Sequence, residues 1–263
     1  MKSIALSICF LLSFCNYLSA EEVKSLMAKP GKLLFDDQGE AKRGKGVKLS
    51  KINENWNVRA NMGIWEKKDG FYQSSWKPGI GHTPVMAYLS NFKNVIIEVT
   101  FRYNEMKEDW HTHCFRIALD NRKLYTGHIL SAWANPNNDF IEKGFLLQHI
   151  SKNKDKNIIA DILFDKQAIK YEVGKWHTAI LEVVDNKALF HMDGNLAYTE
   201  SDRINVEKSH FSLTLGKTLH DVKRVRVWDA KLKSNWQDTK KEILSKRVDF
   251  KAQPHTYKKP VKK

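Results

Sequence analysis

The chain has 263 residues and carries 44 Lys and Arg against 30 Asp and Glu, a formal net charge of +14. This length suffices for one sizeable core, and all-β domains of about 200 to 250 residues often form a single unit. Because Cys9 and Cys15 lie in a segment that we expect to be removed, only Cys114 remains, which excludes a scaffold held by intramolecular disulfides. The basic charge favours polyanionic partners such as sulfated or uronic polysaccharide, an anionic envelope or nucleic acid, unless the lysines only solubilise the surface.

Residues 1–20 have the pattern of a signal peptide. Lys2 gives a short positive region, residues 4–12 are apolar, and residues 18–20 form an acceptable cleavage site. We therefore expect an exported protein, secreted or periplasmic, that begins near Glu21. No later apolar run approaches the roughly 20 residues that a membrane-spanning helix needs.

An irregular lead-in is expected over 21–32, followed by one β-sandwich domain over 33–232. Short strand-like runs separated by turn residues are typical of a sandwich. The runs are expected at 56–58, 64–67, 70–75, 84–89, 94–103, 112–119, 125–132, 144–150, 158–163, 168–173, 176–184, 187–192, 195–200, 209–216 and 222–229.

The best-defined hairpin is centred on Asp193-Gly194, because glycine accepts the positive φ that a tight hairpin turn demands. After the last strand, a capping-box pattern at 234–237 and apolar residues at helical spacing predict a helix over 233–250. We expect this helix to pack on the sandwich, with binding to a membrane surface as the alternative. Residues 251–263 carry five lysines and no acid, which indicates a basic disordered tail.

Strand alternation assigns polar side chains to an outward face. In 95–103, 110–119 and 144–150 the apolar sets should line the core between the sheets. The alternating polar set is then expected on one outward sheet face, with a surface ion pair such as Glu98–Arg116 as the structural alternative. This set comprises Glu98, Arg102, Arg116 and Gln148.

His111 and His113 share one strand face, a spacing that could chelate a metal, or they are simply strand-end histidines. Further metal ligands would come from Asp109, His82 and His128. The oxygen-rich loop 135–139 would suit a structural calcium ion, although its residues are also ordinary turn formers. We predict no other cofactor.

Trp76, Trp110 and Trp133 lie near strand ends or loops, where an indole ring either stacks on a sugar or plugs a loop. The sequence contains no Glu-x-Asp-x-Glu or Glu-x-Asp-x-x-Glu strand motif, no Gly-x-Ser-x-Gly elbow and no His-Glu-x-x-His helix. An enzyme would therefore use a site assembled from several strands.

The order of "GKWH" (174–177), "HMDG" (191–194), "LTLG" (213–216) and "VKRVRVWDA" (222–230) resembles the concanavalin A-like lectin/glucanase superfamily. Within it, the chain looks most like the secreted bacterial 3-keto-disaccharide hydrolase domain family. The shared segments there are "LFDD" (34–37), "GIW" (63–65) with "KDGFY" (68–72), and "GFLLQ" (144–148). The resemblance covers about residues 33–230, with Leu146 where that family usually has Glu.

The resemblance implies a jelly-roll sandwich of two antiparallel sheets whose concave outer face binds sugars. It nominates Arg116 and Gln148 for substrate binding. It leaves Glu98, His111 and His113 as catalytic candidates, beside Arg102 and the three tryptophans on the binding side.

The function expected first is a secreted carbohydrate-active protein that cleaves or binds a glycoside. A lectin-like module for anionic polysaccharide and a cell-envelope adhesion protein stay open as alternatives. Neither specific nucleic-acid binding nor a transmembrane segment after signal removal is expected.

Overall fold

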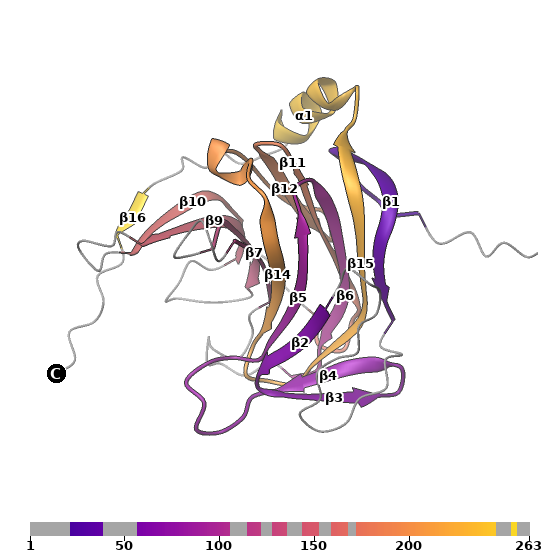
Figure 1. The fold of residues 1–263 in the computed structure, drawn as a ribbon, viewed down its shortest axis with the longest axis vertical. Helices are drawn as coiled ribbons and strands as arrows, with labels where there is room; N and C mark the ends of the chain where they lie inside the picture. The colour runs from indigo at the N-terminus through magenta and orange to yellow at the C-terminus, as the bar shows by residue number, and fades with distance from the viewer. Residues whose placement is uncertain are drawn as a thin grey trace, which may run out of the picture.

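The computed structural model describes residues 22–38, 57–105, 115–121, 128–135, 144–152, 159–167, 172–245 and 254–256. In these residues the chain folds as two antiparallel β-sheets stacked face to face, with α1 (Trp236–Ser245) over one end of the stack (Figure 1). The predicted all-β sandwich with a short C-terminal helix is confirmed.

Sheet I has eight strands in the order β13-β12-β11-β6-β15-β4-β3, with β1 also pairing β15. Its strands are β1 (Ala28–Asp37), β3 (Ile64–Lys68), β4 (Phe71–Ser75), β6 (Val95–Tyr103), β11 (His177–Val184), β12 (Lys187–Met192), β13 (Asn195–Glu200) and β15 (His220–Leu232).

Sheet II has eight strands in the order β16-β10-β9-β8-β7-β14-β5-β2. Its strands are β2 (Asn57–Met62), β5 (Val85–Phe92), β7 (Phe115–Asp120), β8 (Leu130–Asn135), β9 (Gly144–Lys152), β10 (Ile159–Gln167), β14 (Lys208–Leu215) and β16 (Pro254–Thr256). A short 3-10 helix, η2 (Asp202–Ile204), precedes β14. Strands β9 and β10 run at an angle to β5 and β14 (Figure 1), and both contact β13 of sheet I.

The main core lies between the sheets and is built from the alternate apolar residues of their strands. Stacked aromatic rings join the layers: Phe101 stacks on Phe115 at 3.8 Å, and Phe145 stacks on Phe190 at 4.2 Å between ring centroids. Burying rings of this size is a large part of what stabilises a sandwich.

A second apolar cluster covers one end of the outer face of sheet I. There Trp236 and Ile243 of α1 are buried with Met27 and Trp228, so the helix packs on the sandwich as predicted. Within the described residues, no helix is long and apolar enough to cross a membrane.

Three boundaries differ from the expectation. Strand β1 begins at Ala28, so part of the expected lead-in at 21–32 is strand, because its amides find partners on β15. Residues 254–256 of the expected disordered tail pair with β10 as β16. The helix starts at Trp236, and the end of the expected helix, 246–250, lies outside the described residues.

The predicted hairpin at Asp193-Gly194 is confirmed: it joins β12 to β13 with φ values of 49° and 81°. The expected strand at 168–173 is not formed at its described end, because Glu172 and Val173 lie outside any strand.

Candidate functional site

The four polar residues expected on one face lie on two opposite faces. Glu98 and Arg102 extend from β6 on the outer side of sheet I, whereas Arg116 on β7 and Gln148 on β9 lie on the outer side of sheet II. The expectation of one shared face is wrong, because alternation shows only which side chains avoid the core. Both sheets of a sandwich have an outer face, and the pairing order decides which one a strand serves.

The alternative, a surface ion pair between Glu98 and Arg116, is therefore also wrong. Glu98 instead accepts from Arg226 of the neighbouring β15, with 2.6 Å between Oε1 and Nε. Arg102 bonds Asp221 at 2.7 Å, and its guanidinium lies 4.6 Å from the Trp176 ring.

On sheet II, one row of side chains joins Arg116, Trp133 and Gln148. The indole Nε1 of Trp133 donates to Oε1 of Gln148 at 2.7 Å, and the Arg116 guanidinium lies 4.7 Å from the centre of the Trp133 ring. Arg116 also donates to Oγ1 of Thr214, from Nε at 3.2 Å and from Nη2 at 2.9 Å. The strand register places the row, because Arg116 is paired with Trp133 on one side and with Thr214 on the other.

The row combines groups that suit a saccharide: a guanidinium, an indole ring and an amide that both donates and accepts. Gln148 is almost fully buried, and its amide nitrogen makes no hydrogen bond within the described part of the chain. Trp133 keeps part of its surface exposed.

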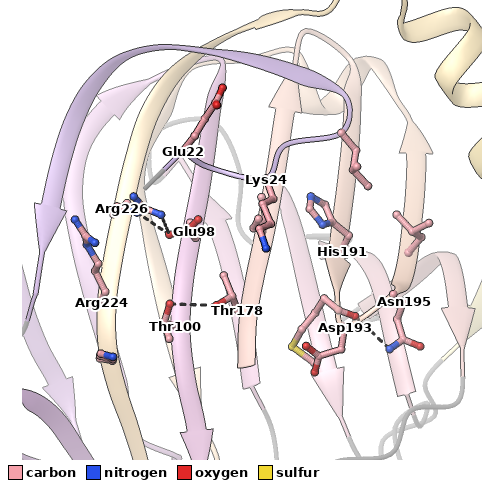
Figure 2. A pocket seen from close by; sticks show the side chains of 16 residues that line it. Glu22, Lys24, Glu98, Thr100, Thr178, His191, Asp193, Asn195, Arg224 and Arg226 are labelled. Carbon is pink, nitrogen blue, oxygen red and sulfur yellow. Dashed lines mark hydrogen bonds and ion pairs between the residues drawn. The ribbon is translucent and has the colours of Figure 1, made fainter. Parts of the chain in front are cut away.

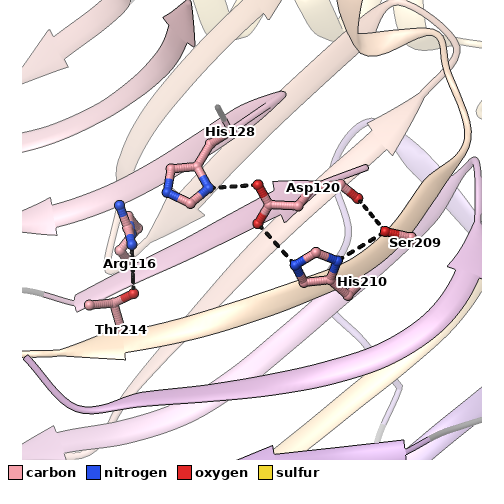
Figure 3. Close-up of polar contacts among 6 residues, drawn as sticks. All are labelled: Arg116, Asp120, His128, Ser209, His210 and Thr214. Atoms are coloured by element: carbon pink, nitrogen blue, oxygen red, sulfur yellow. Dashed lines mark hydrogen bonds and ion pairs between the residues drawn. The ribbon is translucent and has the colours of Figure 1, made fainter. Parts of the chain in front are cut away.

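Four residues further along β7, Asp120 lies between two histidines (Figure 3). Its Oδ1 is 2.7 Å from Nδ1 of His128, and its Oδ2 is 3.4 Å from Nε2 of His210. The other ring nitrogen of His210 is 3.0 Å from the hydroxyl of Ser209. The carboxylate therefore orients both imidazoles.

His128 has the geometry of a general acid or base. Its side chain is 27% exposed, and its Nε2 makes no hydrogen bond to any described residue, while Nδ1 is held by Asp120. A carboxylate on one ring nitrogen fixes the tautomer and stabilises the imidazolium that forms when the other nitrogen takes a proton. This pair can move a proton to or from a group bound beside it.

The two parts of the site are well separated. Arg116 and Asp120 share a face of β7 and are four residues apart, which at strand rise is about 13 Å. A ligand that touches both parts must be extended, which fits an oligosaccharide better than a single ring. We call the row and the Asp120 cluster together the sheet II site.

The remaining predicted residues divide as follows. Trp110, His111 and His113 lie outside the described residues. Trp76 is half-buried and serves its own turn: its Nε1 donates to the carbonyl of Ile80 at 2.9 Å, and Lys217 lies 5.0 Å from its ring. This observation favours the loop-plugging alternative for that tryptophan.

The structure gives no support to a metal site in the part of the chain that it describes. No group of three or more His, Cys, Asp or Glu side chains is arranged to hold an ion there. His82 contacts the carbonyl of Thr83 at 2.8 Å, and His128 contacts Asp120. Asp109 and most of the loop proposed for calcium, 136–139, fall outside the described residues.

Asp120, His210 and Thr214 were not among the residues predicted from the sequence. His210 and Thr214 alternate with core residues in the strand expected at 209–216. This alternation could have identified both as outward-pointing polar residues. His128 was considered only as a metal ligand, because its partner Asp120 ends a different strand.

No family model matches the chain, and no curated protein matches it. Solved structures similar to it include the carbohydrate binding module CBM66 from Bacillus subtilis, with 9% identity over 65% of this chain and 95% of that one and a TM-score of 0.48. SCLam, a non-specific endo-β-1,3(4)-glucanase of family GH16, has 11% identity over 81% and 98%, with a TM-score of 0.49. LamAcat from Zobellia galactanivorans has 13% identity over 75% and 97%, with a TM-score of 0.47. Similarity this distant assigns no activity to the chain, and the site has to be judged by its own geometry.

Proposed function

We propose that this protein is an exported carbohydrate-active protein that binds a glycoside at the sheet II site and transfers a proton to or from it through His128. The observation that carries the proposal is the presence, on one sheet face, of the Arg116–Trp133–Gln148 row and the Asp120–His128 pair. The row supplies recognition, and the pair supplies acid–base chemistry.

A hydrolase of the 3-keto-disaccharide type is the more specific form of this proposal. Gln148 occupies the position of that family's Gln, and Leu146, which is buried, occupies the position of its Glu. No carboxylate is available at Leu146, so in this chain the acid–base role passes to Asp120 and His128. Export to the periplasm or the medium belongs to the same proposal and rests on the pattern of residues 1–20.

The test is a panel of neutral, uronic and sulfated oligosaccharides, offered to the purified chain from residue 21 onward at physiological salt, with binding and released products both measured. His128→Gln should lower turnover by about 10²- to 10⁴-fold while binding persists, because it removes only the proton transfer. His82→Gln, at an exposed histidine outside the site, is the matched control and should leave turnover unchanged.

Gln148→Glu keeps the acceptor for the Trp133 indole and removes the free amide donor, so it should weaken saccharide binding without loss of the fold. Binding without any turnover would make the protein a lectin-like module and overturn the catalytic part. If His128→Gln and Gln148→Glu leave both binding and turnover unchanged, the sheet II site is the wrong site.

A further inference from the structure

A pocket opens on the outer face of sheet I, on the opposite side of the sandwich from the sheet II site. It has a volume of about 590 Å³. Its floor comes from β6, β11 and β15, one side comes from the β12–β13 hairpin, and the N-terminal segment 22–27 passes over it (Figure 2). Ligand pockets usually have volumes of about 300 to 1,000 Å³, so this one can hold a small molecule.

The N-terminal segment is a fixed wall of this pocket. Fully buried Glu182 accepts three backbone N–H groups from it, from Leu26 at 2.7 Å, Met27 at 2.9 Å and Ala28 at 2.5 Å. Lys233 adds a bond from its Nζ to the carbonyl of Ser25 at 2.6 Å. A wall held by charged hydrogen bonds keeps its side chains in place for a ligand.

Several charges of the lining are already neutralised. Arg226 pairs with Glu98 at 2.6 Å, Arg224 pairs with Asp36 at 2.7 Å, and Asp193 lies 2.5 Å from Nδ1 of a buried histidine, His177. Burial alone would raise the pKa of the Asp36 carboxyl, but the hydrogen bonds and charge of Arg224 outweigh it and hold that pKa below its ordinary value. These pairs are in place before any ligand binds.

Two lysines of the lining are different. Neither Lys24, on the N-terminal segment, nor Lys223, on β15, forms an ion pair with a carboxylate of the described residues. The side chain of Lys24 extends from the segment down over the floor, toward Thr178 (Figure 2). Their charges are available to an anionic group in the pocket.

The rest of the lining suits hydroxyl groups. Thr100 and Thr178 place their hydroxyl oxygens 3.3 Å apart on the floor, and His191 and Asn195 stand on the hairpin side (Figure 2). Ile180, Leu26 and Leu196 add apolar surface, which the C–H face of a sugar ring can cover.

We propose that this pocket is a second binding site, selective for an acidic saccharide that carries one carboxylate or sulfate and several free hydroxyls. Lys24 and Lys223 bind the anionic group, while Thr100, Thr178 and Asn195 bind hydroxyls. Glu22 also lines the pocket, and its carboxylate would repel a polyanion that is charged at every unit, so nucleic acid is a poor fit. The inference does not depend on the function of the sheet II site.

The test is isothermal titration at physiological salt with three disaccharides of equal length, one uronic, one sulfated and one neutral. Lys24→Met and Lys223→Met keep the apolar stem and remove the charge, so each should weaken binding of the acidic disaccharides about tenfold. Lys32→Met, at an exposed lysine on β1 outside the pocket, loses the same charge and should leave affinity unchanged. The uronic and sulfated arms identify which anionic group is preferred.

Thr178→Val should weaken binding through loss of a hydroxyl partner with no change of charge, which separates a shaped site from general attraction to a basic protein. Equal binding of the neutral disaccharide, or equal losses for Lys24→Met and Lys32→Met, would overturn the proposal. Loss of acidic-sugar binding on Gln148→Glu but not on Lys24→Met would place the ligand on sheet II and overturn it as well.

Discussion

Lys208 is an ionisable residue inside the protein, and no carboxylate of the described residues lies at hydrogen-bonding distance from it. Its side chain is fully buried, and its Nζ donates to the backbone carbonyls of Lys93 at 2.9 Å and Ile204 at 2.7 Å. Burial lowers the pKa of this lysine from 10.5 to about 8, because two carbonyls replace its hydration only in part.

The depressed pKa of Lys208 predicts a rise in stability at alkaline pH. Between about pH 8 and 10.5 the unfolded chain still binds the proton that the folded chain has released, so the free energy of unfolding increases with pH in that window. The gain of wild type over Lys208→Met should reach about 3 kcal/mol across it. Urea unfolding at pH 7.5, 9 and 10.5 measures this difference.

Lys32→Met, which removes an exposed lysine, serves as the control for the loss of one positive charge. A difference between wild type and Lys208→Met that stays constant from pH 7.5 to 10.5 would contradict a depressed pKa at Lys208.

At the residue scale, strand alternation indicated which polar side chains avoid the core. Arg116 and Gln148 could be selected because each was expected to point outward from an alternating strand, and both do lie on the outer side of sheet II. The Asp120–His128 pair was missed because its two residues belong to different expected strand runs. Asp120 is the last residue of β7, and His128 precedes β8. Local periodicity does not encode a contact between residues that lie outside one strand pattern.

At the element scale, the segment 22–28 is attached to sheet I mainly through Glu182. Glu182→Gln keeps one side-chain oxygen but replaces the other with an NH₂ group, which cannot accept a hydrogen bond. At least one of the backbone amides of Leu26, Met27 and Ala28 therefore loses its acceptor. Loss of a charged acceptor in a buried site costs about 2 kcal/mol or more.

We therefore expect Glu182→Gln to raise hydrogen exchange of the amides of 26–28 while the core strand β6 stays protected. Hydrogen exchange followed by mass spectrometry measures both regions in one experiment. Glu66→Gln, at an exposed glutamate on β3, is the control. Unchanged protection of 26–28 would mean that pairing with β15, and not Glu182, holds the segment.

Most strands were predictable because their apolar and polar residues alternate and because turn-forming residues separate one run from the next. Strand β1 was not among the expected strands, because its start, Ala28-Lys29-Pro30-Gly31, has no alternation and contains proline and glycine, which are depleted in strands. Its register with residues 225–232 comes from a partner almost two hundred residues away.

At the scale of the whole molecule, the two proposed sites lie on opposite faces of one packed core. Which sheet a strand joins depends on pairings such as β6 with β15 and β7 with β14, and these are distant in sequence. This is why the outward residues could be recognised from the sequence while their division between two faces could not.

Opposite faces predict independent effects. Lys24→Met and Gln148→Glu share no contact, so their effects on unfolding free energy should add to within about 0.5 kcal/mol in the double variant. Each substitution should change only the affinity for the ligand that binds on its own face. Urea unfolding and titration of the double variant with both ligands measure this, and a coupling above about 1 kcal/mol would mean that the faces communicate through the core.

The pairing of the N-terminal strand has a consequence for the order in which the protein assembles. Among the described strands, β1 pairs with β15 alone, and the three amides at its start bind a carboxylate more than 150 positions later. A chain that emerges from the ribosome from its N-terminus must carry this segment unpaired until residues 220–232 follow. The first described part of the polypeptide is thus among the last to find its place, and contacts this far apart in sequence slow folding. During that interval the unpaired edge of β1 is the part of the chain most in need of protection from other strands.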